Sequence, residues 1–248
     1  MLKFHPSSVG LIMTDAKSID PTLLTGDLAA IAKKKVKTDE DKAVLQPLHD
    51  QTLSAGAKTF LKSLAKEYLY GYHAVVSTKY MDKGLAVEPE SIALYNSVFF
   101  TNHSKNTQRR ESDILTGECD IFTGKRIIDI KSAWNLDTFP AFSEDAHDAL
   151  YEWQGRAYMN LWDCDEFELA YCLVNTPEEL IRYEQPELHI VDHIPPEQRV
   201  TSLIYTRDTD LEKKIEVKCR AAQQYLADLV ARFEAEKKHE ILQLRKAA

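Results

Sequence analysis

The sequence predicts one α/β domain built around a mixed β-sheet with helices on its flanks. Short runs of β-branched and apolar residues lie in the middle of the chain, and segments with helical periodicity lie before and after them. With 248 residues, of which 44% are hydrophobic, the chain can bury one sizeable core. We expect a single domain over residues 1–248, with a helical part over about residues 1–105 and a long C-terminal helix over about residues 209–240.

The N-terminal part shows several helix signals. The first two expected helices begin with Ser and Pro, which are frequent at helix starts. The polar stretch 37–42 predicts a loop or mobile connection. Pro89 either starts or kinks the last helix of this part. The expected helices are residues 7–15, 21–35, 56–70 and 85–99.

Four strands and two more helices are expected in the rest of the chain. Residues 139–148 contain Pro140 and several acids, which predicts a flexible segment. The Lys, Glu and Ala content of residues 209–237 strongly favours a helix. The expected strands are residues 114–122, 126–133, 166–174 and 200–206, and a helix is expected over residues 148–162.

The first two strands should form a tight β-hairpin with a two-residue turn at Thr123-Gly124. In this register Asp120 lies opposite Ile127, and the alternation of side chains puts Ile127, Asp129 and Lys131 on one face. Asp120, Asp129 and Lys131 therefore converge. A three-residue loop would reverse this parity unless a bulge compensated for it.

Two carboxylates on a shared strand face favour a hard divalent cation, of which Mg²⁺ is the commonest. Lys131 would reach the same site. Its ammonium could stabilise a pentavalent phosphorane or, with a lowered pKa, help to orient and deprotonate a water. The alternative is an exposed hairpin with a solvated Asp–Lys pair, because such short charge patterns arise often by chance.

The wider order of motifs resembles the PD-(D/E)XK nuclease superfamily, and within it the phage lambda exonuclease and YqaJ-like branch. The resemblance covers roughly residues 4–175 and implies a restriction-endonuclease-like core. Its specificity lies in the combination of pieces. These pieces are the helix start His5-Pro6-Ser7-Ser8-Val9-Gly10, the stretch Gly84-Leu85-Ala86-Val87-Glu88-Pro89, the hairpin with Asp120 and Asp129-Ile130-Lys131, and the helix with Trp153-Gln154-Gly155-Arg156-Ala157-Tyr158.

The resemblance implies a role for each matching residue. Asp120 and Asp129 would ligate Mg²⁺, for which Mn²⁺ is expected to substitute, and the Ile130 carbonyl and Glu88 would complete the ligand shell. Lys131 would act on the attacking water. For Glu88, an ordinary capping or surface role stays open as the alternative.

The resemblance also implies contacts with DNA. Gln154 and Tyr158, four residues apart on one helical face, would position Lys131 or the scissile phosphate. Ser8 could offer its hydroxyl and nearby N–H groups to a phosphate. Glu118 departs from the pattern, because lambda-type enzymes have a small hydroxyl residue there. A carboxylate would repel a terminal 5′-phosphate, although in the expected register Glu118 faces Asp129 and could join the metal site.

The implied activity is a metal-dependent deoxyribonuclease, an exonuclease that digests linear duplex DNA in the 5′-to-3′ direction during phage-type recombination. The resemblance further implies a ring-shaped homotrimer, a single-strand annealing protein as partner, and a cytoplasmic location in a bacterial or phage-infected cell. Two alternatives stay open: a structure-specific or restriction-type endonuclease, and a catalytically silent DNA-binding protein. The complete Asp-Asp-Lys set argues against the silent protein.

Composition agrees with such an enzyme. The net charge of −8 argues against a protein that coats nucleic acid, but phosphate binding needs only local basic patches. No apolar run approaches the ~18 residues of a membrane span. The basic patches are Lys33-Lys34-Lys35, Lys37, Arg109-Arg110 and Lys125-Arg126, each of which is also typical of a solvated face.

Other residue types give weaker signals. The four cysteines are scattered without a C-x-x-C pair, so we expect them to be reduced and structural. His189 and His193 have metal-ligand spacing but no third ligand, which argues against zinc. Trp153, Tyr158 and Trp162 could stack on bases, although aromatic residues at such spacing are more often core.

Overall fold

The computed structural model describes residues 2–75 and 77–247, and side chains within the last helix are described to residue 240. The chain divides into two compact units. The helical unit comprises Met1–Phe4, Ser8–Ala74 and Asp210–Ala248, and the sheet unit comprises His5–Ser7 and Val75–Thr209. Because compactness does not measure cooperative folding, the expectation of a single domain stays a prediction. No described helix is long and apolar enough to cross a membrane.

Helices make up the first unit, and side chains cap the starts of two of the longer ones. Thr38 and Asp41 form a reciprocal capping box at the start of α3 (Asp39–Gln51), and Ser54 caps α4 (Ala55–Tyr70) by accepting a hydrogen bond from the backbone N–H of Ala57. Ala65, Leu226 and further apolar residues of α4 and α9 pack into a small core. The helices are α1 (Pro6–Met13), η1 (Pro21–Leu23), α2 (Asp27–Ala32), α3 (Asp39–Gln51), α4 (Ala55–Tyr70) and α9 (Thr209–Ala247).

Two expectations for this unit are wrong in detail. The helix expected over residues 21–35 is broken, because Gly26 takes a φ of 52° between η1 and α2. The loop expected over residues 37–42 contains the start of α3 instead, since the capping box satisfies the first N–H groups of that helix. The helices expected over residues 7–15 and 56–70 are confirmed within two residues as α1 and α4.

The second unit contains a four-stranded mixed sheet, as the sequence predicts. β3 pairs antiparallel with β4, β4 pairs parallel with β5, and β5 pairs antiparallel with β6. Helix α7 (Ala149–Trp162) connects the parallel pair. The strands are β3 (Ile121–Phe122), β4 (Arg126–Ser132), β5 (Glu166–Cys172) and β6 (Val200–Thr206), and β1 (Arg110–Glu111) forms a separate short ladder with β2 (Thr116–Gly117).

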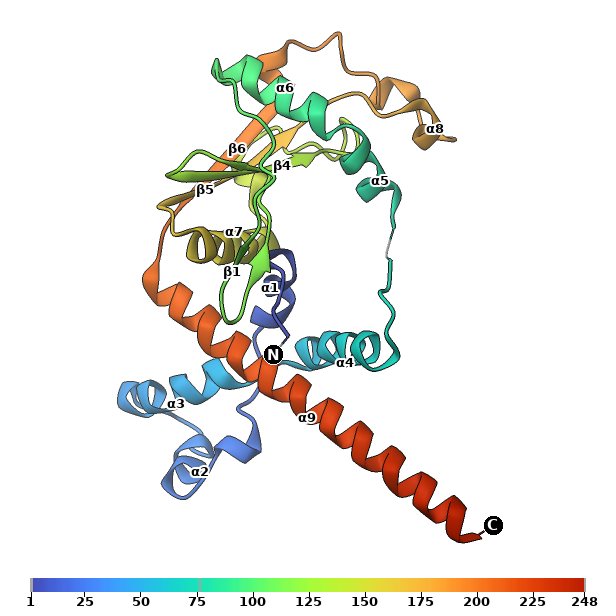
Figure 1. The fold of residues 1–248 in the computed structure, drawn as a ribbon. Coiled ribbons are helices and arrows are strands. Elements are labelled where there is room, and N and C mark those ends of the chain that lie inside the picture. The colour runs from blue at the N-terminus through green and yellow to red at the C-terminus, as the bar shows by residue number, and fades with distance from the viewer. Residues whose placement is uncertain (1, 76, 248) are drawn as a thin grey trace. The chain divides into compact units, whose positions relative to one another are not determined.

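Helices cover both faces of this sheet (Figure 1). Ile128 and Ile130 of β4 pack with α6 residues such as Ile92 and Tyr95 in one apolar cluster. On the opposite face, α7 approaches so closely that a Cβ on Gly155 would lie 2.1 Å from the ring of Phe167. The helical elements of this unit are α5 (Lys79–Ala86), α6 (Glu88–Phe99), η2 (Ser143–Ala146), α7 (Ala149–Trp162), α8 (Glu178–Ile181), η3 (Pro186–Leu188) and η4 (Pro196–Gln198).

Two local expectations have clear outcomes here. Pro89 lies in the first turn of α6 and starts this helix rather than kinking it, because proline lacks only an N–H that has no partner there. Residues 139–148 include one 3₁₀ turn, η2, in which Ala146 is buried. Flexibility of this segment stays a prediction.

The hairpin has a different register from the expected one. Ile121 pairs with Ile128 and Phe122 pairs with Ile127, so Asp120 is not opposite Ile127. The slip amounts to two residues. Because side chains alternate with a period of two, it leaves every side chain on its expected face.

Glycine explains the slip. The turn lies at Gly124-Lys125 rather than at Thr123-Gly124, and the N–H of Thr123 donates to the carbonyl of Arg126 at 2.9 Å. Gly124 has a φ of 93°, which glycine adopts far more readily than other residues do. A two-residue hairpin turn with glycine first therefore closes more easily here than one with threonine first.

Candidate active site

Asp120 and Asp129 lie together at the hairpin, one just before β3 and one within β4. The Oδ2 atom of Asp120 accepts a hydrogen bond from the backbone N–H of Ile130 at 2.8 Å. Asp129 is only 3% exposed. Burial and the negative charge of Asp129 raise the pKa of Asp120 to about 7. Two neighbouring carboxylates that are largely removed from water therefore need a nearby cation to stabilise their ionised forms.

Lys131 supplies part of that positive charge. Its Nζ atom lies 2.8 Å from Oδ2 of Asp129 and sits over the ring of Tyr151. Burial by itself lowers the pKa of Lys131, but the adjacent Asp129 carboxylate more than offsets this, and the pKa lies above its ordinary value. In the protein without bound metal, Lys131 is therefore a cation and not a base.

Helix α7 brings Gln154 and Tyr158 to this site. Nε2 of Gln154 donates to Oδ1 of Asp129 at 2.8 Å, so both oxygens of that carboxylate have a partner. The Tyr158 hydroxyl donates to the backbone carbonyl of Glu118 at 2.6 Å. Gln154 thus contacts Asp129 itself and Tyr158 contacts the segment just before Asp120, and neither has a hydrogen bond to Lys131 among the described contacts.

Glu88 is the first residue of α6 and forms an ion pair with Lys105. Its negative charge contributes to the raised pKa of Asp120. Glu88 therefore lies within electrostatic reach of the aspartate pair, although its described partner is a lysine.

Glu118 does not face Asp129, because the hairpin register differs from the expected one. Its carboxylate pairs with Arg109 instead, with Oε1 3.0 Å from Nε. Ser8 lies in α1 and belongs to the helical unit, whereas the preceding Ser7 contacts the ring of His5 in the sheet unit. The roles expected for Glu118 and Ser8 stay predictions.

The donors at the aspartate pair fit a hard cation. Among the described residues, no group of three or more His, Cys, Asp and Glu side chains could hold a metal ion. The oxygen donors here are two carboxylates and the neighbouring Ile130 carbonyl. Such a small set suits Mg²⁺, which usually keeps several waters and needs only one or two carboxylates. The pKa of Asp120 is raised because burial and the charge of Asp129 disfavour its ionised form. A divalent cation bound between the two carboxylates would reduce this repulsion.

The other groups considered from the sequence have structural partners. Nδ1 of the buried His189 lies 2.9 Å from the Thr176 hydroxyl, and its Nε2 lies 3.3 Å from Glu184, while His193 is exposed. Tyr158 and Trp162 are core residues. All four cysteines, Cys119, Cys164, Cys172 and Cys219, are buried and free, as expected.

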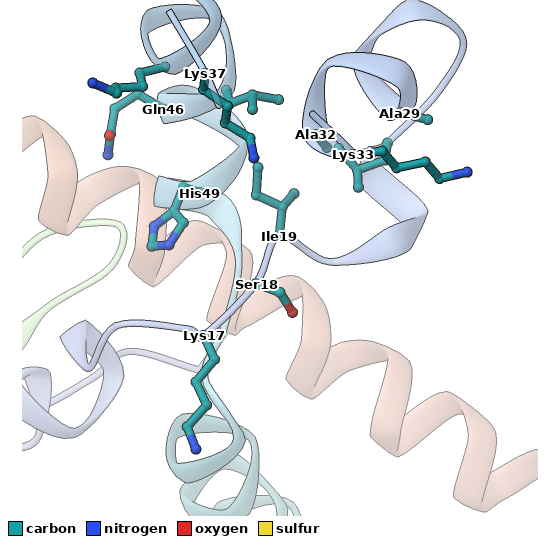
Figure 2. Close-up of a pocket in the computed structure, with 12 residues that line it drawn as sticks. Lys17, Ser18, Ile19, Ala29, Ala32, Lys33, Lys37, Gln46 and His49 are labelled. Atoms are coloured by element: carbon teal, nitrogen blue, oxygen red, sulfur yellow. The ribbon is translucent and has the colours of Figure 1, made fainter. Parts of the chain in front are cut away.

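The basic patches differ in their availability. Arg110 donates to the Trp162 carbonyl at 2.8 Å, and Arg126 pairs with Glu166 and Glu168, so both serve the fold. Lysines gather instead around a cleft of about 540 Å³ in the helical unit (Figure 2). Its lining includes Lys17, Ser18, Ile19, Ala29, Ala32, Lys33, Lys37, Lys42, Gln46 and His49, and no predicted catalytic residue.

Two residues with notable contacts in the sheet unit were not predicted from the sequence. Tyr151 lies three residues before Gln154 on the same helical face, and this spacing was a usable signal. Lys83 is fully buried and donates to three backbone carbonyls near the ends of β4 and β5. Backbone acceptors leave no trace in the sequence, so no signal could have identified Lys83.

Solved structures of exonucleases resemble this chain over most of its length. A phage-related exonuclease from Haemophilus somnus 129PT is 32% identical, with a TM-score of 0.77 over 94% of this chain and 96% of that one. The alkaline exonuclease LHK-Exo from Laribacter hongkongensis is 13% identical, with a TM-score of 0.61 over 96% and 94%. LHK-Exo in complex with dAMP is 16% identical, with a TM-score of 0.60 over 77% and 89%. No protein-family model and no curated protein matches the chain.

Proposed function

Because this chain belongs to the family of phage-related exonucleases, we propose that it degrades linear duplex DNA from an end, in the 5′-to-3′ direction and with Mg²⁺. The enzymes of this family are metal-dependent deoxyribonucleases. The observation that carries the proposal is the meeting of Asp120, Asp129 and Lys131 at the hairpin. These are the charges that metal-assisted phosphodiester hydrolysis needs.

The residues that would hold the metal are Asp120, Asp129, the carbonyl of Ile130 and Glu88. Mg²⁺ bound there would polarise the phosphate and lower the pKa of a bound water, and Mn²⁺ should substitute for it. Gln154 keeps Asp129 oriented, because its amide donates to the carboxylate from the rigid helix α7. Tyr158 likewise restrains the chain just before Asp120 by its hydrogen bond to Glu118.

Lys131 is the candidate catalytic cation. Its ammonium would bind the scissile phosphate and stabilise the negative charge that develops as water attacks. Proton removal from the water is the alternative role, but the raised pKa of Lys131 supports the electrostatic one. Positioning and charge stabilisation of this kind supply much of the ~8–23 kcal/mol by which enzymes lower a barrier.

Further contacts with DNA are part of the proposal. Ser8, near the start of α1, is proposed to donate to a phosphate together with nearby N–H groups. Gln154 and Tyr158 would lie beside the scissile phosphate. A homotrimer, a single-strand annealing protein as partner, action in the cytoplasm and a place in phage-type recombination complete the proposal by family resemblance.

A time course with Mg²⁺ on linear duplex DNA labelled at one end tests the function. Closed circular DNA and the Lys131→Ala variant serve as controls. Nucleotides released only from linear DNA, and lost in the variant, would support the exonuclease, and the labelled end would give the direction. Cutting of the circle would favour the endonuclease instead. Wild-type protein that cleaves neither DNA would contradict the proposal and favour a binding protein.

A further inference from the structure

The proposed mechanism leaves one aromatic contact of the catalytic lysine without a role. Nζ of Lys131 lies 4.4 Å from the centroid of the Tyr151 ring and 2.8 Å from Oδ2 of Asp129. Tyr151 belongs to the first turn of α7, and Gln154 follows it on the same face of that helix. The ammonium is therefore held between a carboxylate and the electron-rich face of a ring.

The backbone around Tyr151 is well restrained. Asp148 caps α7, and its Oδ1 atom accepts hydrogen bonds from the N–H groups of Leu150 at 2.8 Å and Tyr151 at 3.0 Å. One turn later, Gly155 allows α7 to lie directly against Phe167 of β5. The backbone at Tyr151 is therefore fixed. Only the side-chain rotamer has to be ordered for the ring to contact Lys131.

The two partners of Lys131 respond differently to a bound cation. Asp129 is a proposed metal ligand, and a carboxylate that shares its charge with a divalent cation attracts an ammonium less strongly. Tyr151 contributes only a ring face here, so its attraction for the ammonium persists when metal binds. Tyr151 is then the contact that keeps Lys131 near the metal and the phosphate.

We propose that Tyr151 is a positioning residue that holds the Lys131 ammonium in its catalytic place through its ring face. The inference rests on the proposed function of Lys131. It assigns the effect to the aromatic ring and not to the hydroxyl, which separates it from a direct contact between Tyr151 and DNA.

Kinetics on end-labelled linear duplex DNA test the ring. Tyr151→Phe keeps the ring and should retain the wild-type kcat. Tyr151→Leu removes it and should lower kcat about tenfold with an unchanged KM, as expected for the loss of one partly desolvated cation–π contact. Tyr183→Leu is the matched control, because the side chain of Tyr183 is fully exposed.

A double-variant cycle tests whether Tyr151 acts through Lys131. In the Lys131→Ala background, Tyr151→Leu should cause no further loss of the residual rate, because the group that it positions is gone. A full additional tenfold loss would assign Tyr151 a role of its own and overturn the inference.

An NMR measurement tests the contact without using activity. In protein with ¹³C-labelled lysine, the Hε signal of Lys131, identified by its absence in Lys131→Ala, should be shifted upfield by the ring. The shift should persist in Tyr151→Phe and vanish in Tyr151→Leu.

The outcomes separate this inference from the proposed function. Tyr151→Leu with wild-type kcat, or Tyr151→Phe as defective as Tyr151→Leu, would overturn the role of the ring while Lys131 remained essential. Wild-type cleavage by Lys131→Ala would overturn the proposed function itself.

Discussion

Two lysines in the sheet unit have partners of different charge, and their pKa values are shifted in opposite directions. Lys131 is half-buried beside the carboxylate of Asp129, and its pKa lies above the ordinary value although partial burial by itself lowers it. Lys83 has only neutral partners, the backbone carbonyls of Ala133, Trp134 and Val174 at 2.7–2.9 Å, and burial lowers its pKa to about 8. The charge of the partner, more than the depth of burial, decides in which direction the pKa moves.

The two lysines also differ in the role that we expect for each. The side chain of Lys131 is 24% exposed, so part of it is accessible from solvent. Lys83 is fully buried and joins α5 to the segments that follow β4 and β5. We therefore expect Lys131 to govern the rate of cleavage and Lys83 to govern stability.

The largest expected effect is the loss of activity in Lys131→Ala and Asp120→Ala. Each removes a charge that phosphodiester hydrolysis needs, and we expect the rate to fall at least about a thousandfold with the fold intact. Single-turnover cleavage measures the rate, and circular dichroism checks the fold. Either variant cleaving at the wild-type rate would refute the assignment of this site.

Lys83→Met should lower the free energy of unfolding by about 2–4 kcal/mol, because three buried carbonyls lose their donor. Urea unfolding measures this change, and Lys62→Met, at an exposed position of α4, serves as control. Folded Lys83→Met protein should still cleave DNA. A loss of cleavage without a loss of stability would erase the distinction between the two lysines.

Gln154→Leu should reduce cleavage about tenfold, because Asp129 loses the amide donor that orients it. Gln224→Leu is the matched control, since Gln224 donates to Asp228 at the same distance of 2.8 Å on an exposed helix face. Equal effects of the two substitutions on the cleavage rate would mean that orientation of Asp129 does not matter.

The smallest expected effect, counted per pH unit, is a pH dependence of stability. The unfolded chain keeps the Lys83 proton up to its ordinary pKa of 10.5, whereas the folded chain releases it near pH 8. The unfolded state thus binds more protons in this window, and the Lys83 contribution makes stability rise with pH by at most about 1.4 kcal/mol per pH unit. Urea unfolding of the wild type and of Lys83→Met between pH 8 and 10.5 measures this slope as the difference between their free energies of unfolding. A difference that stays flat or falls with pH would contradict the prediction.

The family and the mixed sheet could be predicted from the sequence, and both are confirmed. The shared face of Asp120, Asp129 and Lys131 could be predicted too, because parity survives the slip of the hairpin. Their catalytic roles stay predictions. What alternation cannot reveal is the partner of each charge, such as Arg109 for Glu118 or Lys105 for Glu88.

The missed helices have physical reasons. In α3 the acidic start and Pro47 resemble a loop, although the capping pair Thr38 and Asp41 was visible. In α5 the helix is short, and its one fully buried side chain is Lys83, which no hydrophobic pattern identifies as core. Polar residues that are buried through backbone partners therefore limit what periodicity can predict.

The turn at Gly124-Lys125 has a consequence for the evolution of this hairpin. Each residue added to the turn exchanges the two faces of one strand relative to the other, so a single insertion would replace a carboxylate at the site by an isoleucine. A pair of insertions would restore the site. We therefore expect gaps in an alignment of active relatives to have even lengths at this turn.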